Sequence, residues 1–237
     1  MPDAEIILQI EPAQDSAAAP IRKRPKPGER RVQILQALAS MLEQPGAERI
    51  TTAALAARLD VSEAALYRHF ASKAQMFEGL IEFIEQTVFS LVNQIADRES
   101  ASAEPNAANG LGTAANGEKI DDRVGGVRHA GKVAAMLIQF AEKNPGMTRV
   151  MVGDALVFEN ERLQQRMNQF FDKIESIFRQ NLRGVAQGNS FATPSVDAQV
   201  GASVLIAFVV GRLQRFARSG FKRLPSEHLE ASLARIL

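Results

Sequence analysis

The amino-acid sequence predicts an all-α fold, in which a small three-helix unit near the N-terminus precedes a larger helical domain. Apolar residues recur every three or four positions through most of the chain, which is the period of a helix with one buried face. Serine and threonine residues stand directly before two of the expected helices, where they can cap the first turn. No stretch alternates apolar and polar residues between turn signals, so the sequence favours helices throughout.

The N-terminal side of the chain divides into an arm and three short helices. Residues 1–28 are rich in proline, alanine and charge without a sustained period, and we expect them to form a disordered basic arm. A first helix is expected from Glu29 to Glu43. A second is expected over residues 53–59, capped by Thr51 or Thr52, and a third over residues 63–70, capped by Ser62. The unit therefore spans residues 29–73.

The remaining residues, 74–237, are expected to form one larger helical domain. It begins with a long fourth helix over residues 73–97, whose apolar residues lie within roughly 60° of one line at about 100° per residue and define a core face. These residues are Phe77, Leu80, Ile81, Ile84, Val88, Leu91, Val92 and Ile95. Residues 99–131 are small, polar and glycine-containing, and we expect a flexible loop there. Further helices are expected over residues 132–143, 147–153, 154–182, 196–219 and 226–236.

Composition excludes several classes of protein. The chain has no cysteine and only three scattered histidines, so we expect no metal, and no phosphate-cradling glycine loop or catalytic constellation indicates a cofactor or an enzyme. The N-terminus carries acids where a secretory signal needs bases, and the longest apolar run, Ser203 to Gly211, is far below the roughly 20 residues of a membrane span. We therefore expect a cytoplasmic protein with no membrane segment.

Positive charge is confined to the segment that contains the three short helices. Residues 22–73 hold ten basic and five acidic residues, whereas the whole chain has a net charge of only +1. Residues 1–21 hold four acids and no base, so the remainder of the chain is neutral. A cationic segment of this kind is typical of a module that binds a polyanion.

The third helix has two unlike faces. At about 100° per residue, Glu63, Ala64, Tyr67 and Arg68 share one side, while Ala65, Leu66, His69 and Phe70 share the other. A two-turn helix is not stable alone in water, so Leu66 and Phe70 must hold it against the first two helices while the other face stays outside. This is the arrangement of a DNA-reading helix-turn-helix, in which the second helix braces and the third enters the major groove. The alternative is a pair of structural helices with an incidental surface tyrosine.

The helix-turn-helix interpretation assigns roles to individual side chains. Ser62, Glu63 and the small Ala64 would approach base edges, while Tyr67, Arg68 and Lys73 would contact phosphates. Thr51 and Thr52 would offer hydroxyl and backbone N–H groups to the DNA backbone on the other side. The arm could add phosphate contacts or serve only as a solubilising tail. Its basic candidates are Lys23, Arg24 and Lys26.

Two groups of apolar residues suggest protein partners. Phe83 and Phe89 lie about 120° to either side of the apolar line of the fourth helix, where they mark either a partner patch or a second buried side. The penultimate helix is apolar over more than one face, which favours a subunit interface over an intramolecular core. The residues expected in that interface are Leu205, Phe208, Val209, Arg212 and Phe216.

The stretch TTAALAARLDVSEAALYRHFASKAQMF resembles the DNA-binding signature of TetR-type regulators, which are dimeric, all-helical proteins. Two further stretches, KNPGMTRVMVGDALVFENERLQQRMNQFFDKIE and RFARSGFK, resemble the nucleoid occlusion factors within that family. The resemblance covers about residues 29–224 without the 99–131 segment. It implies a homodimer that binds palindromic sites dispersed over the chromosome and, when bound to DNA, inhibits assembly of the tubulin-like division protein FtsZ, which places it on the nucleoid.

The resemblance also carries individual positions over to this chain. It implies FtsZ contacts around Phe83, Leu91, Met136, Gln139, Lys143 and Asn144, and a phosphate contact for His69, whose side of the helix equally permits packing. The chain departs from the family pattern at several of these positions. Leu91 stands where a base is usual, Gln139 where a glycine is usual and Lys143 where an arginine is usual. Asp60 replaces the usual glycine of the turn, at a modest cost because aspartate tolerates the left-handed conformation.

Two other functions stay open from the sequence. One is a conventional TetR-type repressor released by a small ligand, although the larger domain has phenylalanines but no tyrosine or tryptophan, which suits a dry core better than an inducer pocket. The other is an architectural protein that coats DNA without reading its sequence. That protein would bind all duplexes with similar affinity.

Overall fold

The structure, a computed structural model, describes residues 28–44, 50–102, 115–188 and 194–237, and these residues form helices and no strand. The all-α fold class is therefore confirmed. In chain order the helices are α1 (Glu29–Leu42), α2 (Thr52–Arg58), α3 (Glu63–Tyr67), α4 (Lys73–Ser102), α5 (Ala115–Lys143), α6 (Pro145–Met151), a 3₁₀ turn (Asp154–Leu156), α7 (Glu161–Gly188), α8 (Pro194–Arg218) and α9 (Leu229–Ile236).

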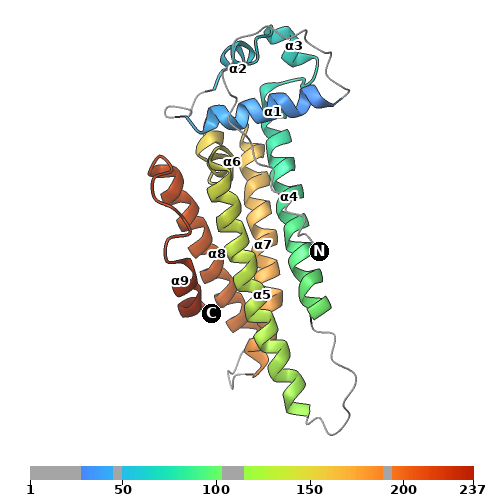
Figure 1. The fold of residues 1–237 in the computed structure, drawn as a ribbon, viewed down its shortest axis with the longest axis vertical. Coiled ribbons are helices and arrows are strands. Elements are labelled where there is room, and N and C mark those ends of the chain that lie inside the picture. Colours follow the sequence, from blue (N-terminus) through green and yellow to red (C-terminus); the bar gives the residue numbers. More distant parts are fainter. Residues whose placement is uncertain (1–27, 45–49, 103–114, 189–193) are drawn as a thin grey trace, which may run out of the picture.

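The helices divide into a small head and a long body (Figure 1). The head comprises α1, α2 and α3 and lies at one end of the molecule, and the body comprises α5 to α9. Helix α4 starts in the head and runs down the body beside α7, with which it shares packing contacts. The arm, with Lys23, Arg24 and Lys26, lies outside the described residues.

Local capping defines the head as the sequence predicts. The Thr51 hydroxyl accepts a hydrogen bond from Ala54 N at 3.1 Å, and the Ser62 hydroxyl accepts one from Ala65 N at 3.3 Å. Between the two helices Asp60 has a φ of 52°, so the residue that replaces the usual glycine does adopt the left-handed conformation. Helix α3 ends at Tyr67, three residues before the expected end.

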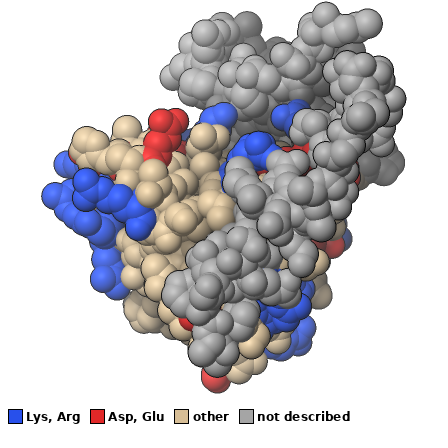
Figure 2. Space-filling view, turned by 90° about the horizontal axis from the view of Figure 1, so that it is seen from below, with Lys and Arg blue, Asp and Glu red and all other residues tan. Residues whose placement is uncertain are grey.

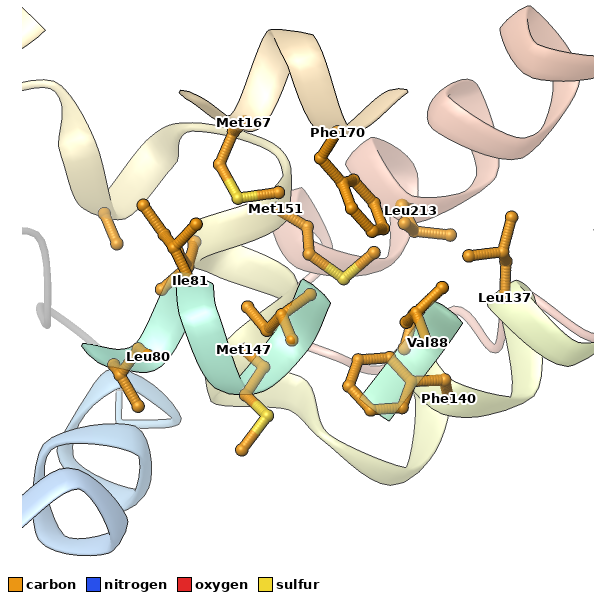
Figure 3. Packing of buried hydrophobic residues seen from close by; sticks show 14 of the residues in the cluster. Leu80, Ile81, Val88, Leu137, Phe140, Met147, Met151, Met167, Phe170 and Leu213 are labelled. Carbon is orange, nitrogen blue, oxygen red and sulfur yellow. The ribbon is translucent and has the colours of Figure 1, made fainter. Parts of the chain in front are cut away.

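The body encloses a continuous apolar core. Figure 3 shows side chains of α4 (Leu80, Ile81, Val88), α5 (Leu137, Phe140), α6 (Met147, Met151), α7 (Met167, Phe170) and α8 (Leu213) meeting in one cluster. All ten are at least nine-tenths buried. The apolar line expected on the fourth helix is therefore its core face. Burial on this scale is what holds helices together that would be unstable alone in water.

The expectation of a flexible loop over residues 99–131 is wrong for most of its length. Helix α4 continues to Ser102 and α5 begins at Ala115, so only residues 103–114 lie outside the described helices. Gly126, one of the glycines that favoured a loop, has a packing role instead. A Cβ on Gly126 would lie 2.2 Å from the Asn181 carbonyl oxygen of α7, so the two backbones approach closely there. Tertiary contact overrides the low helix propensity of glycine in this segment.

Other helices begin at residues different from those expected, for local reasons. The helix expected to end at residue 143 does end there, but the next helix begins at Pro145, two residues earlier than expected, because proline fits the first turn of α6, where its missing N–H costs nothing. The long helix expected from residue 154 begins as a 3₁₀ turn and resumes as α7 at Glu161. Helix α9 begins at Leu229, three residues later than expected.

Candidate nucleic-acid interface and partner surfaces

The exposed face of α3 is the candidate nucleic-acid interface. Leu66 and Phe70 are each only 1% exposed and fix the helix to the head, whereas Tyr67 is 45% exposed. Ser62, Glu63, Ala64 and Arg68 are also exposed. The division of the helix into an anchored and an outward face is therefore confirmed. The roles of the outward side chains toward bases or phosphates stay predictions.

A chain of polar contacts links this face to α2. The Thr52 hydroxyl donates a hydrogen bond to a Glu63 carboxylate oxygen at 2.6 Å, and the Tyr67 hydroxyl lies 3.5 Å from Thr52 Oγ1. The start of α3 is thereby tied to the start of α2, and Thr52, Glu63 and Tyr67 form one continuous polar surface. Thr51 lies beside it and is exposed, although its hydroxyl already caps α2.

The end of α3 is held from α1 by Arg31. The Arg31 Nη1 atom donates a hydrogen bond to the His69 carbonyl oxygen at 3.0 Å, and its guanidinium carbon lies 4.1 Å from the centre of the Phe70 ring. His69 itself is exposed, so the packing role that the sequence left open is wrong. The sequence does not predict a contact between Arg31 and α3, because the two are far apart in the chain and no periodic pattern connects them. Only its place in a cationic segment hints at it.

Lys73, whose phosphate contact stays a prediction, already has a partner within the chain. Its ammonium forms a salt bridge with Glu159, which precedes α7, and lies 5.7 Å from the centre of the Phe77 ring. The side chain is therefore directed to the body and not to a free surface beside α3. A phosphate would have to compete with a carboxylate already in contact, so Lys73 connects head and body in this structure.

The head and the body also touch through α1 and α6. A Cβ on Gly146 would lie 2.0 Å from the Ala39 carbonyl oxygen, so the two backbones meet with no space for a side chain. The Glu43 carboxylate at the end of α1 accepts a hydrogen bond from the Gly146 N–H. Burial raises the pKa of Glu43 and outweighs the lowering effect of that hydrogen bond. The corner before α6 is rigid, because the buried Thr148 hydroxyl bonds to Ala141 O at 2.8 Å.

The expected partner residues lie on α4, on α5 and at the corner that follows α5. On α4, Glu85 pairs with Arg166 of α7 and Phe89 packs edge-on against Phe170 of α7. Phe83 lies about 120° from the α4 core line in the other direction, whereas Leu91 lies within about 60° of that line and is half-buried. Phe83 and Phe89 are both half-buried and both pack against the core cluster, so the second buried side that the sequence offered as an alternative is observed for both.

On α5, the side that faces α4 is marked by His129, whose Nδ1 is paired with Glu99 of α4. Met136 and Lys143 lie within roughly 40° of His129 at about 100° per residue, and Gln139 within roughly 80°. Met136 is half-buried, and Gln139 and Lys143 are exposed. Asn144 follows at the corner, where its Nδ2 bonds to Phe140 O at 2.8 Å. We call these residues, together with Phe83 and Leu91 of α4, the seam surface.

A cluster of charged side chains links α4 to α5 farther along the two helices. Glu99 lies 2.9 Å from Lys132 Nζ and 3.7 Å from Arg128 Nε, in addition to its contact with His129. Burial raises the pKa of the Glu99 carboxyl, but the hydrogen bonds and charges of Lys132 and His129 outweigh burial and hold it below its ordinary value. The cluster connects α4 and α5 on either side of residues 103–114.

The subunit interface expected on α8 also needs correction. Leu205 and Val209 are fully buried and Phe216 is 2% exposed, so these side chains belong to the core of the chain itself. Arg212 donates hydrogen bonds to the carbonyl oxygens of Pro225 and Glu227 and stacks over Phe208, so it fastens the segment before α9. The physical reason is that α8 is apolar on two faces, and periodicity does not tell which one faces inward.

The outward face of α8 is an apolar stripe. It lies within roughly 40° of one line at about 100° per residue and opposite the buried face. Its members are Val196, Val200, Val204, Ala207 and Gly211. Val200 is 56% exposed, and a Cβ on Gly211 would meet nothing within 4 Å. The stripe ends in a hollow of about 620 Å³ that Phe208, Arg215, Arg223 and His228 help to line.

Helix α8 is apolar over a longer stretch than the run from Ser203 to Gly211 indicates. Within the described residues, Ser195–Arg218 is long and apolar enough to cross a membrane by length and composition. One face of the helix packs along α7 and α5, and 28% of its most apolar stretch is buried within this chain. Seen from the end of the body away from the head, the described surface is mostly uncharged, with basic side chains gathered at its margins (Figure 2).

Comparison with known proteins places these features in a family. Residues 34–80 match the model of bacterial regulatory proteins of the tetR family, and residues 127–236 match the SlmA-like model of a tetracyclin repressor-like C-terminal domain. The nucleoid occlusion factor SlmA of Idiomarina loihiensis is 48% identical over 202 residues, which cover 85% of this chain and 90% of the relative. The protein of that name from Vibrio cholerae is 48% identical over 204 residues, with the same coverage of the two chains.

Solved structures show the same fold at low identity. The fatty acid degradation regulator FadR from Bacillus halodurans aligns with a TM-score of 0.62 at 13% identity, over 90% of this chain and 96% of that one. The TetR family transcriptional regulator PfmR from Thermus thermophilus aligns with a TM-score of 0.60 at 18% identity, over 86% and 97% of the two chains.

Proposed function

The chain belongs to the SlmA nucleoid occlusion factors of the TetR family, and from that premise we propose that it reads palindromic chromosomal sites as a dimer and, once bound to DNA, inhibits assembly of FtsZ. This activity would block septum formation over the nucleoid and place the protein on the nucleoid in the cytoplasm. The observation that supports the proposal best is the outward face of α3, because it is exposed, polar and rigidly anchored from behind by Leu66 and Phe70.

The dimer would form through the apolar stripe of α8. Five small or branched apolar residues in a row on an exposed helix face are costly to leave in water. A second copy that packs its own stripe there would cover both, as a two-fold axis requires. Two heads on one DNA face can then reach half-sites in successive turns of the major groove.

The seam surface would receive FtsZ. It combines half-buried apolar side chains, Phe83, Leu91 and Met136, with an exposed cation, Lys143, and an amide, Asn144. An apolar centre with a polar rim is the usual composition of a protein-binding patch. Leu91 in place of the family's base makes this patch more apolar than the family pattern at that position, whereas Gln139 in place of glycine adds a polar amide.

The experiment that tests the proposal is FtsZ polymerisation with GTP, followed by light scattering. The protein is added alone, with a palindromic duplex and with a scrambled duplex of equal length and at equal salt. We expect polymer to be lost only with the palindromic duplex. Polymer that persists with the bound palindrome would leave the ligand-released repressor as the better account, and equal affinity for both duplexes would favour an architectural protein.

Two variants of α4 sharpen this experiment. Phe83→Ala should keep DNA binding and relieve inhibition, because it removes the apolar centre of the seam surface. Phe89→Ala is the matched control, since Phe89 is also half-buried on α4 but packs on α7. It should keep both activities in folded protein. Full inhibition by the Phe83→Ala variant would show that the seam surface is not the FtsZ site.

A further inference from the structure

Arg31 connects the first turn of α1 to the far end of the recognition helix α3. It bonds through Nη1 to the His69 carbonyl oxygen at 3.0 Å, and its guanidinium covers the Phe70 ring with its carbon 4.1 Å from the ring centre. The two residues it contacts are separated from it by 38 positions or more. Arg31 is thus the tertiary contact at the point where the chain leaves α3.

Helix α3 needs such support because it is only five residues long. A helix of this length has no interior, and its last carbonyl groups find no partner within the helix. His69 N and Phe70 N both bond to the same Leu66 carbonyl, at 2.9 and 3.1 Å. The His69 carbonyl would point to solvent without Arg31. A cationic side chain at a helix C-terminus also complements the partial negative charge there.

The chemistry of the contact requires arginine. A planar guanidinium can stack on an aromatic ring and donate a hydrogen bond from its edge at the same time, whereas a lysine ammonium is a point charge on a flexible stem. Phe70 is itself 1% exposed and anchors α3, so the stacked guanidinium covers the anchor on its outer side. Loss of the stack would leave Phe70 and the end of α3 free to shift relative to α1.

We propose that Arg31 is a positioning residue for DNA reading, which sets the orientation of α3 and is not primarily a phosphate contact. This inference rests on the proposed DNA-reading function. It predicts that Arg31 affects discrimination between duplexes, because an altered orientation misplaces the outward face of α3 against base edges while leaving nonspecific attraction intact. A phosphate contact would instead weaken binding to every duplex by a similar factor.

The test compares Arg31→Ala, Arg31→Lys and Arg68→Ala with the unaltered protein. Fluorescence anisotropy gives affinities for a palindromic and a scrambled duplex over a series of salt concentrations, and circular dichroism verifies that each variant is folded. We expect both Arg31 variants to lose about tenfold in affinity for the palindrome, with the scrambled duplex and the salt slope unchanged. Arg68→Ala should weaken both duplexes and lower the salt slope by about 0.9.

Three results would overturn the inference. Recovery of affinity in Arg31→Lys, together with a reduced salt slope in Arg31→Ala, would identify a phosphate contact. Unchanged affinity in a folded Arg31→Ala variant would mean that α3 keeps its orientation without this residue. Equal affinity of the unaltered protein for both duplexes would refute sequence reading itself, and this result is distinguishable because it appears before any substitution is made.

Discussion

Helices α3 and α8 each bury one face and expose another, but the exposed faces are opposite in kind. The outward face of α3 carries a hydroxyl, a carboxylate, a phenol and a guanidinium, from Ser62, Glu63, Tyr67 and Arg68. The outward face of α8 carries the apolar stripe around Val200 and Val204. A polar outward face is well solvated in water and is available to bind a hydrated ligand. An apolar outward face is stable only when another surface covers it.

The difference also explains which predictions from the sequence were correct. On α3 the polar and apolar residues alternate with the helical period, so the pattern identifies the buried side without a structure. On α8 both sides are apolar, and the pattern alone cannot tell core from interface. The sequence therefore assigned Leu205 and Val209 to a subunit contact, although the chain buries both in its own core. The structure separates the two faces because only it shows where α7 and α5 lie.

The largest expected effect comes from removing the anchor of α3. Leu66→Ala deletes a fully buried side chain and should cost about 2–5 kcal/mol of the stability of the head. Discrimination between palindromic and scrambled duplexes should be lost, because an unanchored helix of five residues has no fixed outward face. Anisotropy titration with both duplexes measures this, and urea unfolding measures the stability. Retained discrimination would mean that Phe70 alone suffices as anchor.

The second expected effect is on α8. Val200→Glu places a carboxylate in the centre of the apolar stripe and should dissociate the dimer, because burying an unpaired charge in an interface costs several kcal/mol. Sedimentation velocity at micromolar concentration gives the oligomeric state. Val157→Glu is the control, since Val157 is 62% exposed in the segment before α7 and away from the stripe. Dimers that persist in the Val200→Glu variant would place the subunit interface elsewhere.

A smaller effect is expected on the outward face of α3. Tyr67→Ala should weaken palindrome binding by about tenfold to a hundredfold, as the loss of one hydrogen bond to a charged group would do, while the dimer stays folded. Tyr67→Phe separates the hydroxyl from the ring, and we expect it to reproduce most of the loss. If anisotropy shows unchanged affinity for both variants, the assignment of Tyr67 to the groove is wrong.

The smallest effect concerns the charged cluster in the seam. The pKa of Glu99 is held below its ordinary value in the folded protein, so its ionised form stabilises the fold above the ordinary glutamate pKa, and this contribution is lost as the pH falls through the lowered pKa. Glu99→Gln should therefore cost about 1 kcal/mol at pH 7 and progressively less below pH 4.5. Urea unfolding at several pH values tests this. Glu82→Gln, an exposed position on the same helix, should show a weaker trend.

The parts of the molecule that the sequence could not predict depend on contacts between distant segments. The loop expected over residues 99–131 turned out mostly helical, because Gly126 lets α5 lie against the backbone of α7 at Asn181. The salt bridge between Lys73 and Glu159 could not be predicted, because the two residues are far apart in the chain. Arg31 gave no periodic signal, since its partners are 38 residues away. By contrast, the caps at Thr51 and Ser62 and the left-handed Asp60 are local, and local chemistry suffices to predict them.

The backbone contact between Gly146 and Ala39 fixes the position of the head relative to the body. No side chain lies between the two backbones, so the head cannot turn relative to the body unless α1 and α6 separate. In a dimer, the packing of the two bodies would therefore set the distance between the two α3 helices. A dimer with heads fixed in this way would tolerate little change in the spacing between the two DNA half-sites. Inserting one base pair between the half-sites turns one of them by about 34° around the DNA axis, and a rigid pair of heads would no longer grip both.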